Sequence, residues 1–193
     1  MDQVDLELWF GDLHKKFAKL PREKKERALL LAGRAARTCF EHLVDKVREL
    51  QTEMTARHLL GALGVSLVFR NEGKVGNFVV RAEYSPTERE ITIYTDSVSQ
   101  ILEAKEAIEA TLDMELTYKN LLELIIWHEL FHYLERREMF LQKELSGHPE
   151  LVGCRKIIEE IAAGRFVQIV TKLPTTPVVI EYILQQQSGE KHA

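Results

Sequence analysis

Hydrophobic positions recur at helical spacing through the first third of the chain. Between residues 1 and 20, large apolar side chains stand three or four positions apart: Leu6, Phe10, Leu13 and Phe17. Pro21 suits the first turn of a second helix, and apolar positions at the same spacing continue to Leu50. This pattern predicts a pair of helices at the start of the protein.

The hydrophobic period changes after Gly64. Residues 65–70, 77–84 and 91–95 are rich in β-branched and aromatic side chains, which is typical of strands. Ser, Pro and charged residues fill the intervening segment 85–90, whose length suits a hairpin connection. We therefore expect three strands, of which the second and third pair antiparallel.

Helical spacing returns by Val98 and dominates the rest of the sequence. A long helix is expected from near Thr117 through the segment HELFH, with further helices over residues 155–172 and 177–187. The expected fold class is α+β, a mainly helical domain with a small, mostly antiparallel three-strand sheet packed on the helix that contains HELFH. In this interpretation residues 1–62 are a helical N-terminal extension and residues 63–193 form the core.

The HELFH segment carries the candidate chemistry. Residues four positions apart lie on one face of a helix, so His128 and His132 can direct their imidazole rings to a single metal ion. Glu129 lies one helical step away, where its carboxylate can reach a water molecule at the metal without becoming a ligand. The pattern predicts a zinc site with Glu129 as general base. The alternative is an accidental motif on a helix that binds no metal.

A catalytic zinc site needs a third protein ligand and one open position. Glu138 stands where metzincins place their third ligand, but Glu135 occupies the position of the glycine that bends the chain in that motif. His148 lies in a Gly-His-Pro turn, where histidine is more commonly a surface residue. The remaining candidates are Glu159 and Glu160, in the helix that follows the motif helix. Periodicity alone does not choose between these two glutamates.

The segment from Ile91 to Pro174, a little under half of the chain, resembles the minimal core of ImmA/IrrE-type metallopeptidases, which are glutamate zincins. It has a strand, an HExxH helix and a helix that matches the family pattern at five positions: Glu160, Ala163, Phe166, Leu173 and Pro174. The resemblance implies Glu129 as the catalytic base and three zinc ligands: His128, His132 and Glu160. Phe131 departs from the family, because members commonly have glycine at that position.

The resemblance implies a zinc-dependent peptidase that acts on a peptide or protein. A regulator is one such substrate, because proteins of this type are associated with cleavage of repressors. An extended peptide is expected to pair with the strand over residues 91–95, which precedes the motif helix. The donor that stabilises the oxyanion stays open among Tyr133, His148 and Tyr182. The alternative function is a zinc-stabilised protein-interaction module without catalysis.

Composition and charge narrow the possible partners. Lys and Arg total 26 against 30 Asp and Glu, a net charge of −4, so no nucleic-acid partner is expected. The excess of Lys and Arg in residues 14–37 is attributed to the solvated faces of amphipathic helices. The sequence has neither a secretory signal nor a run of about eighteen apolar residues, which predicts a cytoplasmic protein without a membrane partner. Cys39 and Cys154 are expected to pack as free cysteines.

Overall fold

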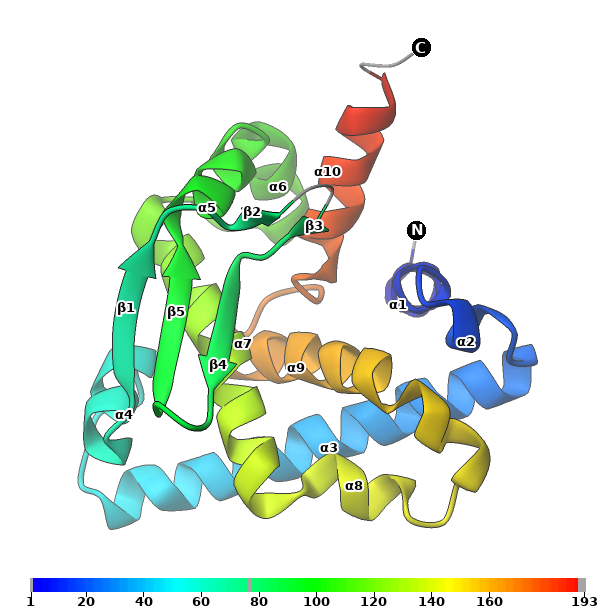
Figure 1. Cartoon of the computed structure of the whole chain (residues 1–193), viewed down its shortest axis with the longest axis horizontal. Coiled ribbons are helices and arrows are strands. Elements are labelled where there is room, and N and C mark those ends of the chain that lie inside the picture. The colour runs from blue at the N-terminus through cyan, green and yellow to red at the C-terminus, as the bar shows by residue number, and fades with distance from the viewer. Residues whose placement is uncertain (1, 76–77, 191–193) are drawn as a thin grey trace.

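The computed structural model describes residues 2–75 and 78–190 and is mainly helical, with a small sheet on one side (Figure 1). The helices are α1 (Gln3–Asp12), α2 (Lys15–Ala18), α3 (Arg22–Glu49), α4 (Ala56–Leu63), α5 (Thr95–Leu102), α6 (Lys105–Leu112), α7 (Tyr118–Glu138), α8 (Phe140–Leu145), η1 (Pro149–Cys154), α9 (Arg155–Thr171) and α10 (Val178–Glu190). The strands are β1 (Ser66–Arg70), β2 (Lys74–Val75), β3 (Phe78–Val79), β4 (Ala82–Ser85) and β5 (Glu90–Tyr94). The α+β, mainly helical fold class is confirmed.

The N-terminal helices pack directly on the helices that follow the sheet. Pro21 directly precedes α3, one position before the predicted first turn, and α3 runs along α9 and α8 (Figure 1). Arg165 on α9 donates hydrogen bonds to the fully buried carboxylate of Glu7 on α1. Gly33 on α3 makes room for this contact, because a Cβ there would lie 2.4 Å from an Arg165 nitrogen. Segments from both ends of the sequence thus share one core.

The three-strand sheet is mixed, with β5 in the centre. β4 pairs antiparallel with β5, placing Tyr84 opposite Ile91, so the predicted hairpin is confirmed. β1 pairs parallel with the other side of β5, placing Leu67 opposite Ile91. The predicted strand over residues 77–84 is divided in the described residues into β3 and β4, and β3 pairs with β2 in a short ribbon that the sequence analysis did not predict. Residue 77 lies outside the described residues.

The central position of β5 corrects one prediction. Residues 91–95 were expected to form the free edge along which a peptide pairs, and this is wrong because both sides of β5 are occupied by neighbouring strands. The edge next to α7 is β4, where the Tyr84 ring packs edge-on against the Tyr133 ring at 5.5 Å. The sheet therefore presents β4, and not β5, to the helix that carries HELFH.

Local sequence accounts for the limits of α7. The Thr117 hydroxyl caps the first turn by accepting a hydrogen bond from the Asn120 N–H at 3.1 Å. Met139 takes a left-handed conformation with φ of 57° and ends the helix. The buried Glu135 carboxylate accepts hydrogen bonds from the N–H groups of Leu141 and Gln142, which opens α8. Glu135 is therefore a structural residue that turns the chain after the motif helix.

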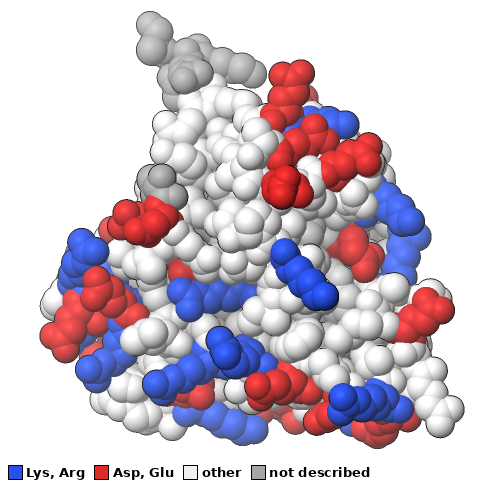
Figure 2. Space-filling model, turned by 180° about the vertical axis from the view of Figure 1, so that it is seen from behind, with Lys and Arg blue, Asp and Glu red and all other residues white. Residues whose placement is uncertain are grey.

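Charged side chains on the surface are mixed in sign. On the face turned away in Figure 1, Lys and Arg lie among Asp and Glu over the lower part of the molecule (Figure 2). Within residues 14–37, Lys25 pairs with Asp12 at 2.7 Å and Arg22 pairs with Glu26 at 2.7 Å. Arg22 lies at a solvated helix face, whereas the Lys25 side chain is largely buried beside its acidic partner. In the described ranges no helix combines the length and apolar character needed to cross a membrane, and Cys39 and Cys154 are free and buried.

Candidate metal centre

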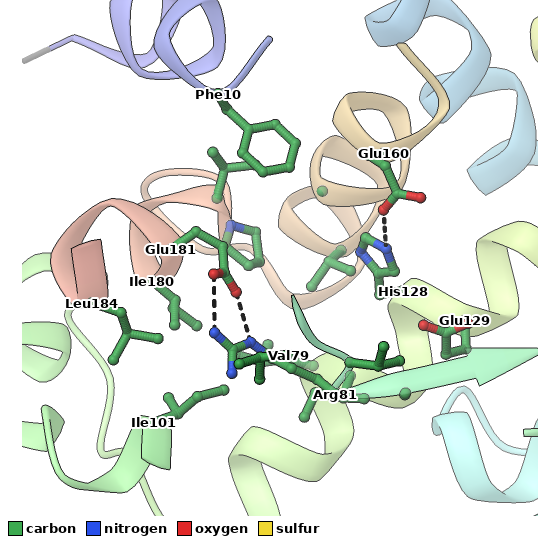
Figure 3. Close-up of a pocket in the computed structure, with 18 of the residues that line it drawn as sticks. Phe10, Val79, Arg81, Ile101, His128, Glu129, Glu160, Ile180, Glu181 and Leu184 are labelled. Carbon is green, nitrogen blue, oxygen red and sulfur yellow. Dashed lines mark hydrogen bonds and ion pairs between the residues drawn. The ribbon is translucent and has the colours of Figure 1, made fainter. Parts of the chain in front are cut away.

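Two helices bring three potential metal donors together. His128 and His132 project from one face of α7. Glu160 projects toward His128 from α9 (Figure 3). His128 Nε2 lies 3.0 Å from a Glu160 oxygen and 3.2 Å from His132 Nε2, and the other Glu160 oxygen lies 3.5 Å from His132 Nε2. The donor atoms all lie within 4.8 Å of one another.

These separations fit a tetrahedral zinc ion. Zinc binds imidazole nitrogen and carboxylate oxygen at about 2.0–2.2 Å, so tetrahedral ligand atoms stand about 3.4 Å apart. The two Nε2 atoms lie 3.2 Å apart, and Glu160 approaches them through different oxygens, at 3.0 Å from His128 Nε2 and 3.5 Å from His132 Nε2, so each separation is close to that value. Two nitrogens and one carboxylate oxygen also form a donor set that leaves one coordination position open. The chemistry and spacing of His128, His132 and Glu160 therefore fit zinc.

Glu159 and Glu160 have different positions in this cluster. Glu160 faces the Nε2 atoms of both histidines, whereas a Glu159 oxygen lies 3.0 Å from His132 Nδ1. When Nδ1–H donates to Glu159, the Nε2 lone pair of His132 is directed toward Glu160 and His128. Sequence periodicity could not separate the two glutamates. Their geometry places Glu160 among the donors and Glu159 behind His132, a role that the sequence analysis did not assign.

The carboxylates make the cluster a favourable place for positive charge. Partial burial opposes ionisation of Glu160, but hydrogen bonds from His128 and His132 hold its pKa well below the ordinary value. Burial lowers the pKa of His132, and the larger combined effect of hydrogen bonds to Glu159 and Glu160 raises it to about 10. The protein thus stabilises a cation at His132, and a metal ion can replace the proton in that role.

Glu129 lies beside the donors without joining them. Its side chain is buried, with 7% of the residue exposed, and burial raises the pKa of its carboxyl group. The histidines and, to a smaller extent, the nearby backbone N–H of Tyr84 offset part of this rise. The N–H contact connects the motif helix to strand β4. Glu129 is therefore held next to the metal-binding face by the edge of the sheet.

The other third-ligand candidates lie elsewhere. Glu138 turns toward α3, where a carboxylate oxygen lies 3.8 Å from His42 Nε2. His148 lies just before η1, with its Nδ1 3.7 Å from a carboxylate oxygen of Glu150. Neither Glu138 nor His148 belongs to the group of possible metal ligands found among the described residues.

Phe131, the departure from the family pattern, packs away from the donors. Its side chain is fully buried, and its ring centroid lies 5.6 Å from that of Phe166 on α9. The ring centroid of His132 lies 5.9 Å away. Phe131 therefore fills the space between α7 and α9 behind the metal-binding face, and it leaves the donor positions intact.

The donors and Glu129 open into a cleft of about 1170 Å³. Its walls come from β3, β4, α1, α5, α7, α9 and α10 (Figure 3). Of the three oxyanion donors considered from sequence, Tyr133 accepts a hydrogen bond from Arg137 at 2.8 Å, and Tyr182 packs edge-on against Trp9. Neither tyrosine nor His148 lines the described cleft, so the geometry selects none of them.

Comparison with known proteins adds no relative. A scan against models of protein families, a search of curated proteins and a search of solved structures each gave no match to this chain. The residues of the cleft are therefore the basis for assigning a function to this chain.

Proposed function

We propose that this chain is a zinc-dependent peptidase. The observation that carries the proposal is the triangle of donor atoms from His128, His132 and Glu160, with a buried glutamate at position 129 beside it. A purely structural zinc site needs no such carboxylate, and structural sites are usually closed by a fourth protein ligand. The donor set and the adjacent base together favour hydrolysis.

In this proposal His128, His132 and Glu160 hold the ion. Bound zinc supplies a Lewis acid that polarises a carbonyl group and makes water acidic enough to attack near neutral pH. The Glu129 carboxylate takes a proton from the attacking water as the oxygen–carbon bond forms. It then delivers that proton to the leaving amine as the carbon–nitrogen bond breaks. The raised pKa of Glu129 suits a group that must both accept and return a proton.

The edge of the sheet supplies a place for the substrate backbone. The Tyr94 N–H bonds to the Arg81 carbonyl at 2.9 Å, which makes these residues a hydrogen-bonded pair of the β4–β5 ladder. Such pairs alternate along antiparallel strands, so Ala82 and Tyr84 direct their backbone groups away from β5. The influence of the Tyr84 N–H on the pKa of Glu129, which lies on α7 and not on β5, agrees with this orientation. Ala82 and Tyr84 both line the cleft, where an extended peptide can add to the sheet.

The first test combines zinc content with hydrolysis. We expect about one zinc per chain in protein purified without chelator, and release of peptides from unfolded casein. Glu129→Gln should retain the zinc and lose at least about a hundredfold in rate, because general-base catalysis is removed. Absence of bound zinc after reconstitution, or an undiminished rate in Glu129→Gln, would reject the proposed mechanism. Retained zinc without hydrolysis of casein or of the peptides described below would favour the interaction module.

A further inference from the structure

The face of α7 that carries the histidines continues in both directions with different chemistry. Toward the N-terminus of the helix, Leu124 and Leu121 lie four and seven residues before His128. Toward the C-terminus, Arg136 lies four residues after His132. Side chains at these intervals share one helix face, and all of them line the cleft. The motif helix therefore presents apolar side chains on one side of the donors and a cation on the other.

The face of α9 repeats this division. Gly164 and Val167 lie four and seven residues after Glu160, whereas Lys156 lies four residues before it, and all line the cleft. α9 runs antiparallel to α7, as three successive contacts demonstrate: Arg155 with Glu135, Glu159 with His132, and Phe166 with Trp127. The apolar ends of the two faces therefore meet at one side of the donors, and the cationic ends meet at the other.

The apolar arm of the cleft is defined by Leu121, Leu124, Val167, Val80, Ile101 and Ile180. Figure 3 shows Ile101 and Ile180 around the ion pair between Arg81 and Glu181, which joins the strand region to α10 at 2.6 and 2.9 Å. Because the Arg81 guanidinium and the Glu181 carboxylate share two hydrogen bonds, each charge is neutralised by the other in the wall of the cleft. Glu103 also lines this arm and opposes a negatively charged ligand there.

The cationic arm is defined by Arg136 and Lys156. Both side chains are exposed, and within the described parts of the chain neither one forms an ion pair or a hydrogen bond through its charged group. Arg136 lies three residues after Tyr133, whose ring packs against that of Tyr84 on β4 at 5.5 Å. The cationic arm therefore lies at the carboxyl end of β4, and the apolar arm lies near Val80 and Ala82 at its amino end.

We propose that the cleft selects an extended peptide with acidic side chains before the scissile bond and large apolar side chains after it. This specificity rests on the proposed peptidase function. A peptide that pairs antiparallel with β4, the more stable mode of pairing, begins near Tyr84 and ends near Ala82. Its early residues then face Arg136 and Lys156, and its later residues enter the apolar arm.

Binding to a catalytically impaired protein tests this order directly. The zinc-loaded Glu129→Gln variant is titrated with a fluorescent peptide in which two glutamates precede, and two leucines follow, a central Ala–Ala bond. A second peptide has the same composition in reverse order. Fluorescence anisotropy should give about tenfold tighter binding of the first peptide, since both leucines are buried only in that order. Equal affinity, or tighter binding of the reversed peptide, overturns the proposal.

Variants in each arm test which residues of the cleft cause the peptide selectivity. In the Glu129→Gln background, Arg136→Glu with Lys156→Glu should replace the preference for glutamate by one for lysine at the early positions. Lys143→Glu, the same change of charge as each of these replacements but at an exposed site on α8 outside the cleft, should leave the preference unchanged. Val80→Asp, at a 36% exposed position, should weaken binding of the leucine peptide about tenfold without affecting zinc content. A preference that survives these changes overturns the assignment of the arms.

The same two peptides test the proposed specificity and the proposed peptidase activity independently. Cleavage of the first peptide at its Ala–Ala bond by the parent protein, with the reversed peptide cleaved at least about tenfold more slowly, supports both. If the parent cleaves neither peptide but Glu129→Gln still binds the first one selectively, the peptidase proposal fails and the assignment of the arms stands. Cleavage of both at equal rates supports the peptidase and overturns the specificity.

Discussion

Histidine and glutamate meet in two kinds of place in this protein. At α7 and α9, His128, His132 and Glu160 converge with donor atoms within 4.8 Å of one another. At the end of α7, His42 and Glu138 meet as one pair at 3.8 Å. The residue types are the same, but only the first place has three donors, a supporting carboxylate and a cleft. Convergence of several groups, more than the presence of histidine and glutamate, distinguishes a candidate metal site from a surface ion pair.

Removal of one donor from each place should have the largest effect on zinc binding. Glu160→Gln should abolish stoichiometric zinc binding, with a loss of affinity greater than the 10–100-fold typical of supporting residues, on the order of 10³-fold. Glu138→Gln makes the same chemical change at the isolated pair and should retain the zinc of the parent. Competition with a chromophoric chelator measures both affinities. Equal affinities in the two variants would contradict the assignment of Glu160 as a ligand.

Helical periodicity predicted the donors on α7 but could not assign the third one. His128 and His132 share a helix face by their spacing alone, so local sequence was sufficient. Glu159 and Glu160 are adjacent, and the choice between them depends on how α9 packs against α7, which the helix sequence does not specify. The resemblance to glutamate zincins indicated Glu160, whose carboxylate oxygens lie 3.0 Å from His128 Nε2 and 3.5 Å from His132 Nε2.

The edge strand was missed for a related reason. The hairpin between β4 and β5 is local and was predicted from the turn residues, whereas the place of β1 depends on a pairing across more than twenty residues. That parallel pairing puts β5 in the centre of the sheet and leaves β4 as the edge beside α7. Local patterns therefore identified the strands and left their order undetermined.

A second prediction concerns Glu159, which contacts His132 without being among the proposed ligands. The Glu159→Gln variant should keep one zinc per chain but bind it about 10–100-fold more weakly, because an amide orients His132 less effectively and makes it a weaker base. Its affinity should lie between those of the parent and Glu160→Gln in the same chelator competition. Loss of zinc in Glu159→Gln with retention in Glu160→Gln would reverse the assigned roles.

Zinc binding at the cluster should depend on pH. Glu159 and Glu160 raise the pKa of His132 to about 10, so the imidazole carries a proton at pH 7 that zinc must displace. Zinc affinity should therefore fall about tenfold for each unit of decrease between pH 8 and 6, with about one proton released per ion bound. Calorimetry in buffers of different ionisation enthalpy measures the released protons. Binding without proton release at pH 7 would contradict the raised pKa.

The smallest expected effect is a shift in the midpoint of thermal unfolding when zinc is removed by a chelator. Zinc at a hundred times its dissociation constant stabilises the folded chain by about 2.7 kcal/mol. For a chain of this size each kcal/mol shifts the midpoint by about 2–4 °C, so chelation should lower it by about 5–10 °C. His42→Ala removes a partly exposed pair, worth at most about 1 kcal/mol, together with a ring contact to Phe140, and should leave the effect of chelation intact. In His128→Ala the same chelator should produce no shift, because the ligand through which zinc stabilises the fold is gone. A chelator-induced shift of parental size in His128→Ala would place the stabilising metal outside α7 and α9.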